Sequence, residues 1–154
     1  MGFSLTGLVI AAVVFAPSLL LIPLPPAGGI AQLATAGPVI TALERVGQVS
    51  CILLLCLSGR ELAPATVDAW FVLLAVCILV YYGLWARYLT RGRDVALLFR
   101  PLWIIPIPMA VFPVLTFAFA AAWSRSSWLA IATVVLAAGH LTNSWYSYRR
   151  FPAD

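Results

Sequence analysis

The sequence predicts an all-α integral membrane protein, a single bundle of five membrane-spanning helices. Hydrophobic residues make up 64% of the 154 residues and charged residues only 9%, and the mean hydropathy is +1.05. A soluble domain has about 45–50% apolar and about 25% charged residues. The apolar residues also fall into five stretches of about 20 residues, the length that crosses a bilayer as a helix. Because the connections between them are short, we expect no separate soluble domain.

The five expected spans are residues 3–22, 38–57, 67–88, 102–123 and 128–146. No basic residue precedes Arg45, whereas a secretory signal carries a positive segment before its apolar run, so we interpret the first stretch as a retained span. Residues 46–57 alone would measure about 18 Å, too short for a hydrocarbon core of about 30 Å. The second span is therefore expected to begin at Pro38. The Pro- and Gly-rich connection before it is expected to be irregular, with a short turn at residues 30–34.

The arginines predict the orientation in the membrane. Six arginines fall on one side (Arg87, Arg91, Arg93, Arg100, Arg149 and Arg150), and the loops of the other side contain Arg60 and Arg125. The positive-inside rule then places the C-terminus in the cytoplasm and the N-terminus outside. All nine basic residues are arginine, which is typical of GC-rich bacterial genomes, so the expected location is a bacterial inner membrane. A charge of +4 without a water-exposed domain does not indicate a nucleic-acid partner.

Two further features of the connections fit a spanning bundle. Residues 92–101 place apolar side chains between arginines, and we expect them to form a short helix in the headgroup layer. Aromatic residues gather at both expected boundaries, as in other membrane bundles. The outer set is Trp70, Trp123 and Trp128, and the inner set is Trp85, Tyr88, Trp103, Trp145 and Tyr148.

Polar residues recur along one face of two expected spans. In the second span the spacing is i, i+3, i+7 and i+10, and the residues are Thr41, Glu44, Gln48 and Cys51. In the fifth span the spacing is i, i+3, i+4 and i+7, and the residues are His140, Asn143, Ser144 and Ser147. Hydrogen-bonding groups within a bilayer should face protein rather than lipid. Glu44 and His140 each lie about six residues from the cytoplasmic end of their span, so we expect them at similar depth. Tyr81, Tyr82 and the segment 106–108 are expected in the same layer.

This layer predicts a polar pocket in the cytoplasmic half of the membrane, which binds or transports a small hydrophobic or lipid-like ligand. The expected ligand-binding residues are Glu44, Gln48, Tyr82, Trp85, His140, Asn143 and Ser144. Arg87, Arg91, Arg93 and Arg100 either determine the topology alone or also contact anionic headgroups. One histidine and one glutamate without a third partner do not predict a metal site, and whether a cofactor is bound stays unknown. The oligomeric state stays open, and self-association is one of the alternatives.

Two other functions remain open. Glu44 and His140 can act as the acid/base pair of a membrane-embedded enzyme that acts on a lipid. Alternatively, the protein is a scaffold or assembly subunit, in which the polar faces only hold helices together. Independently of these functions, Glu44 also has a purely structural interpretation, in which it pairs with an arginine of the connection after the third span.

Four segments carry a resemblance to known sequences. They are "LERVGQ" in the second span, "YYGLWARY", "PLWIIPIPMAVFP" and the terminal "GHLTNSWYSY". Their layout resembles a group of small bacterial membrane proteins to which no activity is attached. The resemblance covers most of the chain and implies the same membrane architecture, but it transfers no function.

Overall fold

Six α-helices form the described part of the chain, which comprises residues 2–27, 35–57 and 67–150 of a computed structural model. The helices are α1 (Leu5–Leu19), α2 (Pro38–Leu57), α3 (Ala69–Thr90), α4 (Ala96–Phe99), α5 (Pro108–Trp123) and α6 (Ser127–Tyr148). The prediction of an all-helical protein is confirmed for these residues. The turn expected at residues 30–34, together with Arg60, lies outside them.

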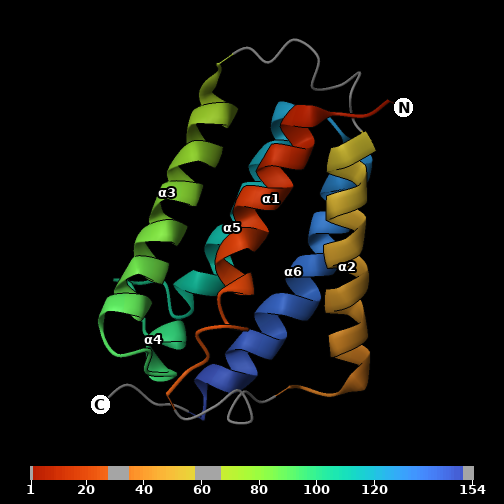
Figure 1. The fold of residues 1–154 in the computed structure, drawn as a ribbon. Helices are drawn as coiled ribbons and strands as arrows, with labels where there is room; N and C mark the ends of the chain where they lie inside the picture. The colour runs from red at the N-terminus through yellow and green to blue at the C-terminus, as the bar shows by residue number, and fades with distance from the viewer. Residues whose placement is uncertain (1, 28–34, 58–66, 151–154) are drawn as a thin grey trace.

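The axes of the five longer helices are roughly aligned, and the helices form a bundle (Figure 1). The chain reverses direction from each of these helices to the next. The most extensive helix pairs are α2 with α6 and α3 with α5, and both pairs are antiparallel. The helix α1 lies in front of α5, and α4 lies beside the lower end of α3 (Figure 1). Figure 1 also shows α1 and α2 close together at their upper ends and separated at their lower ends.

Side-chain caps and prolines determine where several helices begin. The hydroxyl of Ser4 accepts a hydrogen bond from the N–H of Gly7 at 3.0 Å, and a carboxylate oxygen of Asp68 accepts one from Phe71 at 3.0 Å. Ser126 caps α6 in the same way. Such bonds satisfy N–H groups that have no partner within the helix. Pro108 occupies the first turn of α5, where the N–H it lacks would be unpaired anyway.

The second span begins and ends at the expected residues, but the fourth does not. The helix α5 begins at Pro108, six residues after the expected start at 102, because Pro106 and Pro108 prevent the earlier residues from continuing a helix. Leu102 and Ile105 instead exchange two backbone hydrogen bonds of 3.0 Å. The turn that they close holds Trp103 with a positive φ of 56°. Trp103 is 98% exposed and Ile104 94% exposed.

The apolar residues expected in a headgroup-layer helix are instead buried in the protein. Within and beside α4, the side chains of Val95, Leu97, Leu98 and Phe99 are all buried. They pack with Trp85, Tyr88 and Met109 in a cluster at the lower end of the bundle. These four side chains are therefore not available to insert into lipid. Trp85 and Tyr88 are likewise core residues rather than members of the inner aromatic set.

A second, larger core cluster fills the upper half of the bundle. Its buried members come from α1, α2, α3, α5 and α6, and include Ile10, Cys51, Leu74, Phe117 and Leu129. By length and composition, two helices of the described chain, α2 and α3, can cross a membrane. The helices α1 and α5 are apolar but shorter, with 15 and 16 residues.

Candidate functional site

A cavity of about 590 Å³ lies between the helices, and all six of them contribute to its wall. Its polar wall comes from α2 and α6, with Glu44, Arg45, Gln48, His140 and Ser144. The rest is mostly apolar and aromatic: Val14, Phe15, Leu21, Ile22, Tyr81, Trp85, Leu98, Phe99, Met109, Ala110, Pro113, Phe117 and Leu136, with Ser18 as an added hydroxyl. Ligand pockets have about 300–1,000 Å³ and combine a few polar groups with apolar walls. The cavity fits that description.

The polar wall is built around the carboxylate of Glu44. One oxygen of Glu44, Oε1, lies 2.7 Å from Nδ1 of His140, and the other, Oε2, accepts a hydrogen bond of 2.5 Å from Nδ2 of Asn143. The acid on α2 therefore meets two side chains of α6 that follow it by about 100 positions in the sequence. The polar faces of the two helices are turned toward each other, as their spacing suggests.

The hydrogen bonds of Glu44 determine which nitrogen of His140 remains available. An ionised carboxylate only accepts hydrogen bonds, so Nδ1 of His140 is the donor in this pair. Among the described residues no partner is recorded for Nε2 of His140, and the side chain lines the cavity. Glu44 thus orients the imidazole in the way that a carboxylate orients the base of a catalytic dyad. With the hydrogen on Nδ1, a neutral imidazole has a lone pair on Nε2, which can accept a hydrogen bond or a proton from a bound molecule.

Asn143 connects this pair to the chain that precedes α2. It is buried, and its Oδ1 accepts a hydrogen bond of 2.8 Å from the N–H of Ala36. It does not line the cavity, so it supports Glu44 from behind rather than facing a ligand. Both ends of its amide are therefore occupied, which fixes the orientation of the side chain.

Glycines bring α2 and α6 close enough for these hydrogen bonds. A Cβ placed on Gly139 would overlap the backbone of Glu44, and a Cβ on Gly47 would overlap the backbone of Leu136. One turn further along, Sγ of Cys51 lies 3.9 Å from Oγ1 of Thr133. Small residues at a helix interface allow this approach of two backbones.

The aromatic wall contains one of the two expected residues, together with Tyr81, Phe15, Phe99 and Phe117. Trp85 lines the cavity as expected, but Tyr82 does not. Tyr82 is 40% exposed and donates a hydrogen bond of 2.9 Å to the carbonyl of Val13 on α1. Its neighbour Tyr81 is 5% exposed and lines the cavity, with its ring edge-to-face with that of Trp85 at 6.3 Å. The indole N–H of Trp85 is buried without a hydrogen-bond partner among the described residues.

The four arginines after the third span do not line this cavity. Arg87 extends toward the loop, where its Nη2 lies 3.4 Å from the carbonyl oxygens of Leu97 and Arg100. The carbonyl of Arg93 accepts a hydrogen bond of 3.0 Å from Ala27. None of these arginines forms an ion pair with Glu44 in the described structure, so the interpretation of Glu44 as their partner is wrong. The carboxylate of Glu44 forms its hydrogen bonds with α6 instead.

Sequence reasoning missed the contribution of α1. Phe15 and Ser18 line the cavity from this helix, and the Ser18 hydroxyl donates a bond of 2.8 Å to the carbonyl of Phe15. The available signal was Ser18 itself, a hydroxyl next to Pro17 in an otherwise apolar stretch. It was weak because such a serine can satisfy itself within its own helix, as it does here.

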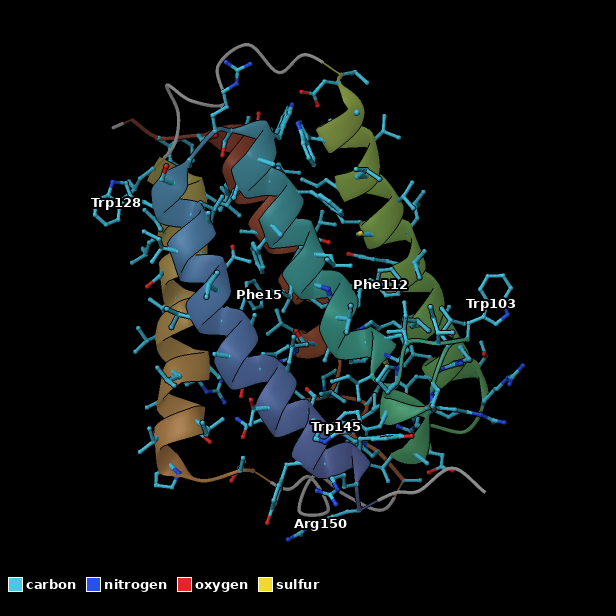
Figure 2. The ribbon with its side chains drawn as sticks, turned by 180° about the vertical axis from the view of Figure 1, so that it is seen from behind. Phe15, Trp103, Phe112, Trp128, Trp145 and Arg150 are labelled. Atoms are coloured by element: carbon cyan, nitrogen blue, oxygen red, sulfur yellow. The ribbon has the colours of Figure 1, made fainter. Side chains whose placement is uncertain are left out.

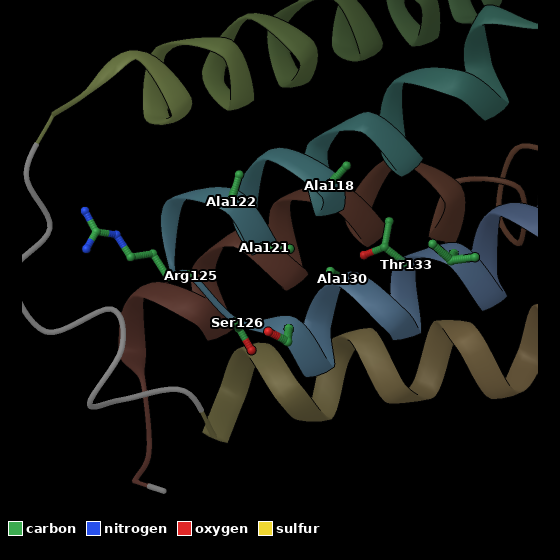
Figure 3. Close-up of a pocket in the computed structure, with 9 residues that line it drawn as sticks. Ala118, Ala121, Ala122, Arg125, Ser126, Ala130 and Thr133 are labelled. Atoms are coloured by element: carbon green, nitrogen blue, oxygen red, sulfur yellow. The ribbon is translucent and has the colours of Figure 1, made fainter.

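Two other hollows lie outside this site. One, of about 450 Å³, lies where α5 turns into α6; several alanines, Arg125 and Ser126 line it, and the side chain of Arg125 points away from the others (Figure 3). The second, of about 560 Å³, is an apolar groove between α1 and α3. Neither contains a polar cluster comparable with that around Glu44.

No protein-family model, curated protein or solved structure matches this chain. This result is consistent with a resemblance to small bacterial membrane proteins that transfers no function.

Proposed function

We propose that the protein is a multi-pass membrane protein whose central cavity binds a small hydrophobic or lipid-like ligand. In this proposal α1, α2, α3, α5 and α6 cross the bilayer, and the cavity lies in its cytoplasmic half. The single observation that carries the proposal is the cavity itself, where a polar wall from α2 and α6 faces an apolar wall from the other helices.

The exposed surface supports a lipid environment. Only 17% of the apolar stretch of α2 and 28% of that of α3 is buried within the protein, whereas a core helix of a soluble protein is mostly buried. Many large apolar side chains point outward from the other helices as well. Trp128 projects near one end of the bundle, and Trp103 projects from the lower half (Figure 2). Aromatic residues favour the two interfaces of a bilayer.

The two shorter helices are compatible with crossing. At 1.5 Å per residue α1 spans about 22 Å and α5 about 24 Å, so each needs a few flanking residues to cover about 30 Å. The turns after α1 and the turn closed by Leu102 and Ile105 supply this length, and their backbone groups are largely hydrogen-bonded internally. Non-helical backbone near a bilayer is tolerated when its polar groups are paired.

The distribution of charge supports a cytoplasmic location for the lower end of the bundle. The end of α3, the loop after it and the end of α6 contain six arginines, and Arg125 is the single described arginine near the opposite end. The positive-inside rule favours this orientation in a bacterial inner membrane.

The proposal is tested by identifying what accompanies the protein after mild extraction. Native mass spectrometry of the detergent-purified protein should detect a bound small molecule. Ser144→Phe fills the cavity from its polar wall and should remove that molecule. Thr142→Phe is the matched control, because Thr142 is exposed on the same helix and does not line the cavity. Circular dichroism and gel filtration verify that both variants fold. Equal occupancy in the two folded variants contradicts the proposal.

The hydrogen bond between Glu44 and His140 favours a second candidate function, a membrane-embedded enzyme that uses Nε2 of His140 as an acid or base. The two candidates differ in what happens to the bound molecule. An enzyme converts it during incubation, and His140→Gln stops the conversion while the molecule stays bound. If neither binding nor conversion is found, the same hydrogen bonds act only in helix association, as in the scaffold alternative.

A further inference from the structure

One cationic side chain of the cavity wall forms no ion pair among the described residues. Arg45 is exposed and lines the cavity, and its recorded contact is a long hydrogen bond of 3.4 Å to Oε1 of Gln48. A guanidinium has five N–H donors, so most of its donors are available for a ligand.

The carboxylate oxygens of the neighbouring residue Glu44 already accept hydrogen bonds. Glu44 gives one oxygen to His140 and the other to Asn143, so its carboxylate is paired on both sides. A cationic ligand would have to compete with these two donors and would approach Arg45 at the same time. The remaining polar groups of the wall, Gln48 and Ser144, can donate or accept. The formal charges of Glu44 and Arg45 cancel, so a preference for an anion depends on the N–H donors of Arg45 that remain available and on the other arginines around it.

The surrounding end of the molecule is positively charged. Seven arginines lie there among the described residues: Arg45, Arg87, Arg91, Arg93, Arg100, Arg149 and Arg150. Among the described residues the acids of that region are Glu44 and Asp94, and a carboxylate oxygen of Asp94 accepts a hydrogen bond of 3.0 Å from the N–H of Ala96. A region with this balance of charge attracts anions and disfavours cations.

The position of the exposed lining residues indicates where the cavity opens. Arg45 on α2 and Ile22, just beyond the end of α1, both line the cavity and are both exposed. Ile22 follows the C-terminal end of α1 and Arg45 lies in the N-terminal half of α2, and Figure 1 shows the two helices separated at these ends. An apolar side chain and a cation at one opening match a ligand that has a hydrocarbon part and an anionic end.

We infer that the ligand is a single-chain amphiphile with a carboxylate or phosphate headgroup, and that Arg45 binds this headgroup. The inference rests on the proposed function and specifies its ligand class. The chain occupies the apolar part of the wall, formed by Phe15, Met109, Phe117 and their neighbours. The headgroup lies at the opening between α1 and α2, with Gln48 beside it. The ligand enters sideways from the inner leaflet.

Four probes with the same chain test this inference: palmitic acid, hexadecyl phosphate, hexadecanol and hexadecyltrimethylammonium. Their binding to the protein in lipid nanodiscs is measured by native mass spectrometry. We expect the two anions to bind more tightly than the alcohol, and the cation to bind most weakly. Arg45→Gln should weaken the anions by about tenfold or more and leave the alcohol unchanged. The control is Arg91→Gln, which removes an exposed arginine from the same end outside the cavity.

The outcomes separate this inference from the proposal on which it rests. If all four probes bind equally and are all removed by Ser144→Phe, the cavity binds ligands but the preference for anions is wrong. If Arg45→Gln and Arg91→Gln weaken the anions equally, the headgroup responds to the general field and Arg45 is not its site. If no probe binds the wild-type protein, the proposed function itself fails. Comparison of palmitic acid with hexadecyl phosphate distinguishes the two headgroups.

Discussion

Substitution of Gly139 by alanine tests whether contact between α2 and α6 holds the polar site together. The added Cβ would overlap the backbone N and Cα of Glu44 and lie 2.8 Å from its Cβ. Carbon atoms pack favourably at about 3.5–4.0 Å, so α6 must move away from α2 by roughly 1 Å. The obstructing atoms are mostly backbone, which cannot turn aside as a flexible side chain can.

The magnitude follows from three contributions. Overpacking costs about 1–3 kcal/mol, and each of the two weakened interhelical hydrogen bonds adds about 0.6 kcal/mol on average. The better helix propensity of alanine offsets at most about 1 kcal/mol. We expect Gly139→Ala to lower the free energy of unfolding by about 1–3 kcal/mol, measured by titration with denaturing detergent and monitored by circular dichroism.

Gly83 provides the matched control. It lies within α3, and a Cβ placed on it meets nothing within 4 Å. Gly83→Ala should therefore raise the free energy of unfolding by about 0.5–1 kcal/mol through helix propensity alone. If Gly139→Ala stabilises the protein as Gly83→Ala does, the helices are not in backbone contact at this point and our account of the site is refuted.

Three further substitutions test separate parts of the structure. Asn143→Ala leaves a carboxylate oxygen of Glu44 and the N–H of Ala36 without their hydrogen bonds. The free energy of unfolding should therefore fall by about 2 kcal/mol in a denaturation experiment; an unchanged value would mean that water replaces the amide. Tyr82→Phe removes the bond to Val13 outside the cavity, so it should cost about 0.5–1 kcal/mol while ligand occupancy in native mass spectrometry stays constant; a loss of ligand would place Tyr82 in the site. Trp103→Asn suits a positive φ better and should raise stability in detergent by up to about 1 kcal/mol; a decrease would indicate that the exposed indole makes contacts that stabilise the fold.

The polar layer was predictable because helical periodicity fixes which residues share a face. Glu44 and His140 were assigned to similar depths from the distance to the ends of their helices, and the structure brings them to 2.7 Å. The partner of Glu44 was the open question. An arginine and a histidine are both chemically suitable, and only the packing of α2 on α6 through Gly47 and Gly139 decides between them.

Other features depended on tertiary contacts that periodicity does not encode. Tyr81 and Tyr82 are adjacent in sequence, so their side chains point about 100° apart around the axis of α3. The rotation of α3 about its axis in the bundle decides which of them faces the cavity. The start of α5 was predicted too early because an apolar segment with two prolines can be a kinked helix or a turn. Here the exchanged backbone bonds of Leu102 and Ile105 favour the turn.

The two glycines between α2 and α6 have a mechanical consequence. With backbone against backbone, these two helices cannot slide or separate without losing their closest contacts, so we expect them to move as one rigid unit. The first helix is attached to this unit mainly at its upper end, where backbone bonds join Gly2 to Leu57 and Ser4 to Cys56. That attachment can serve as a hinge. The carbonyls of Val13 and Leu24 accept hydrogen bonds from Tyr82 and Tyr88 of α3. A swing about this hinge would therefore carry α1 together with α3 and widen the lower gap, while the residues around Glu44 stay in place.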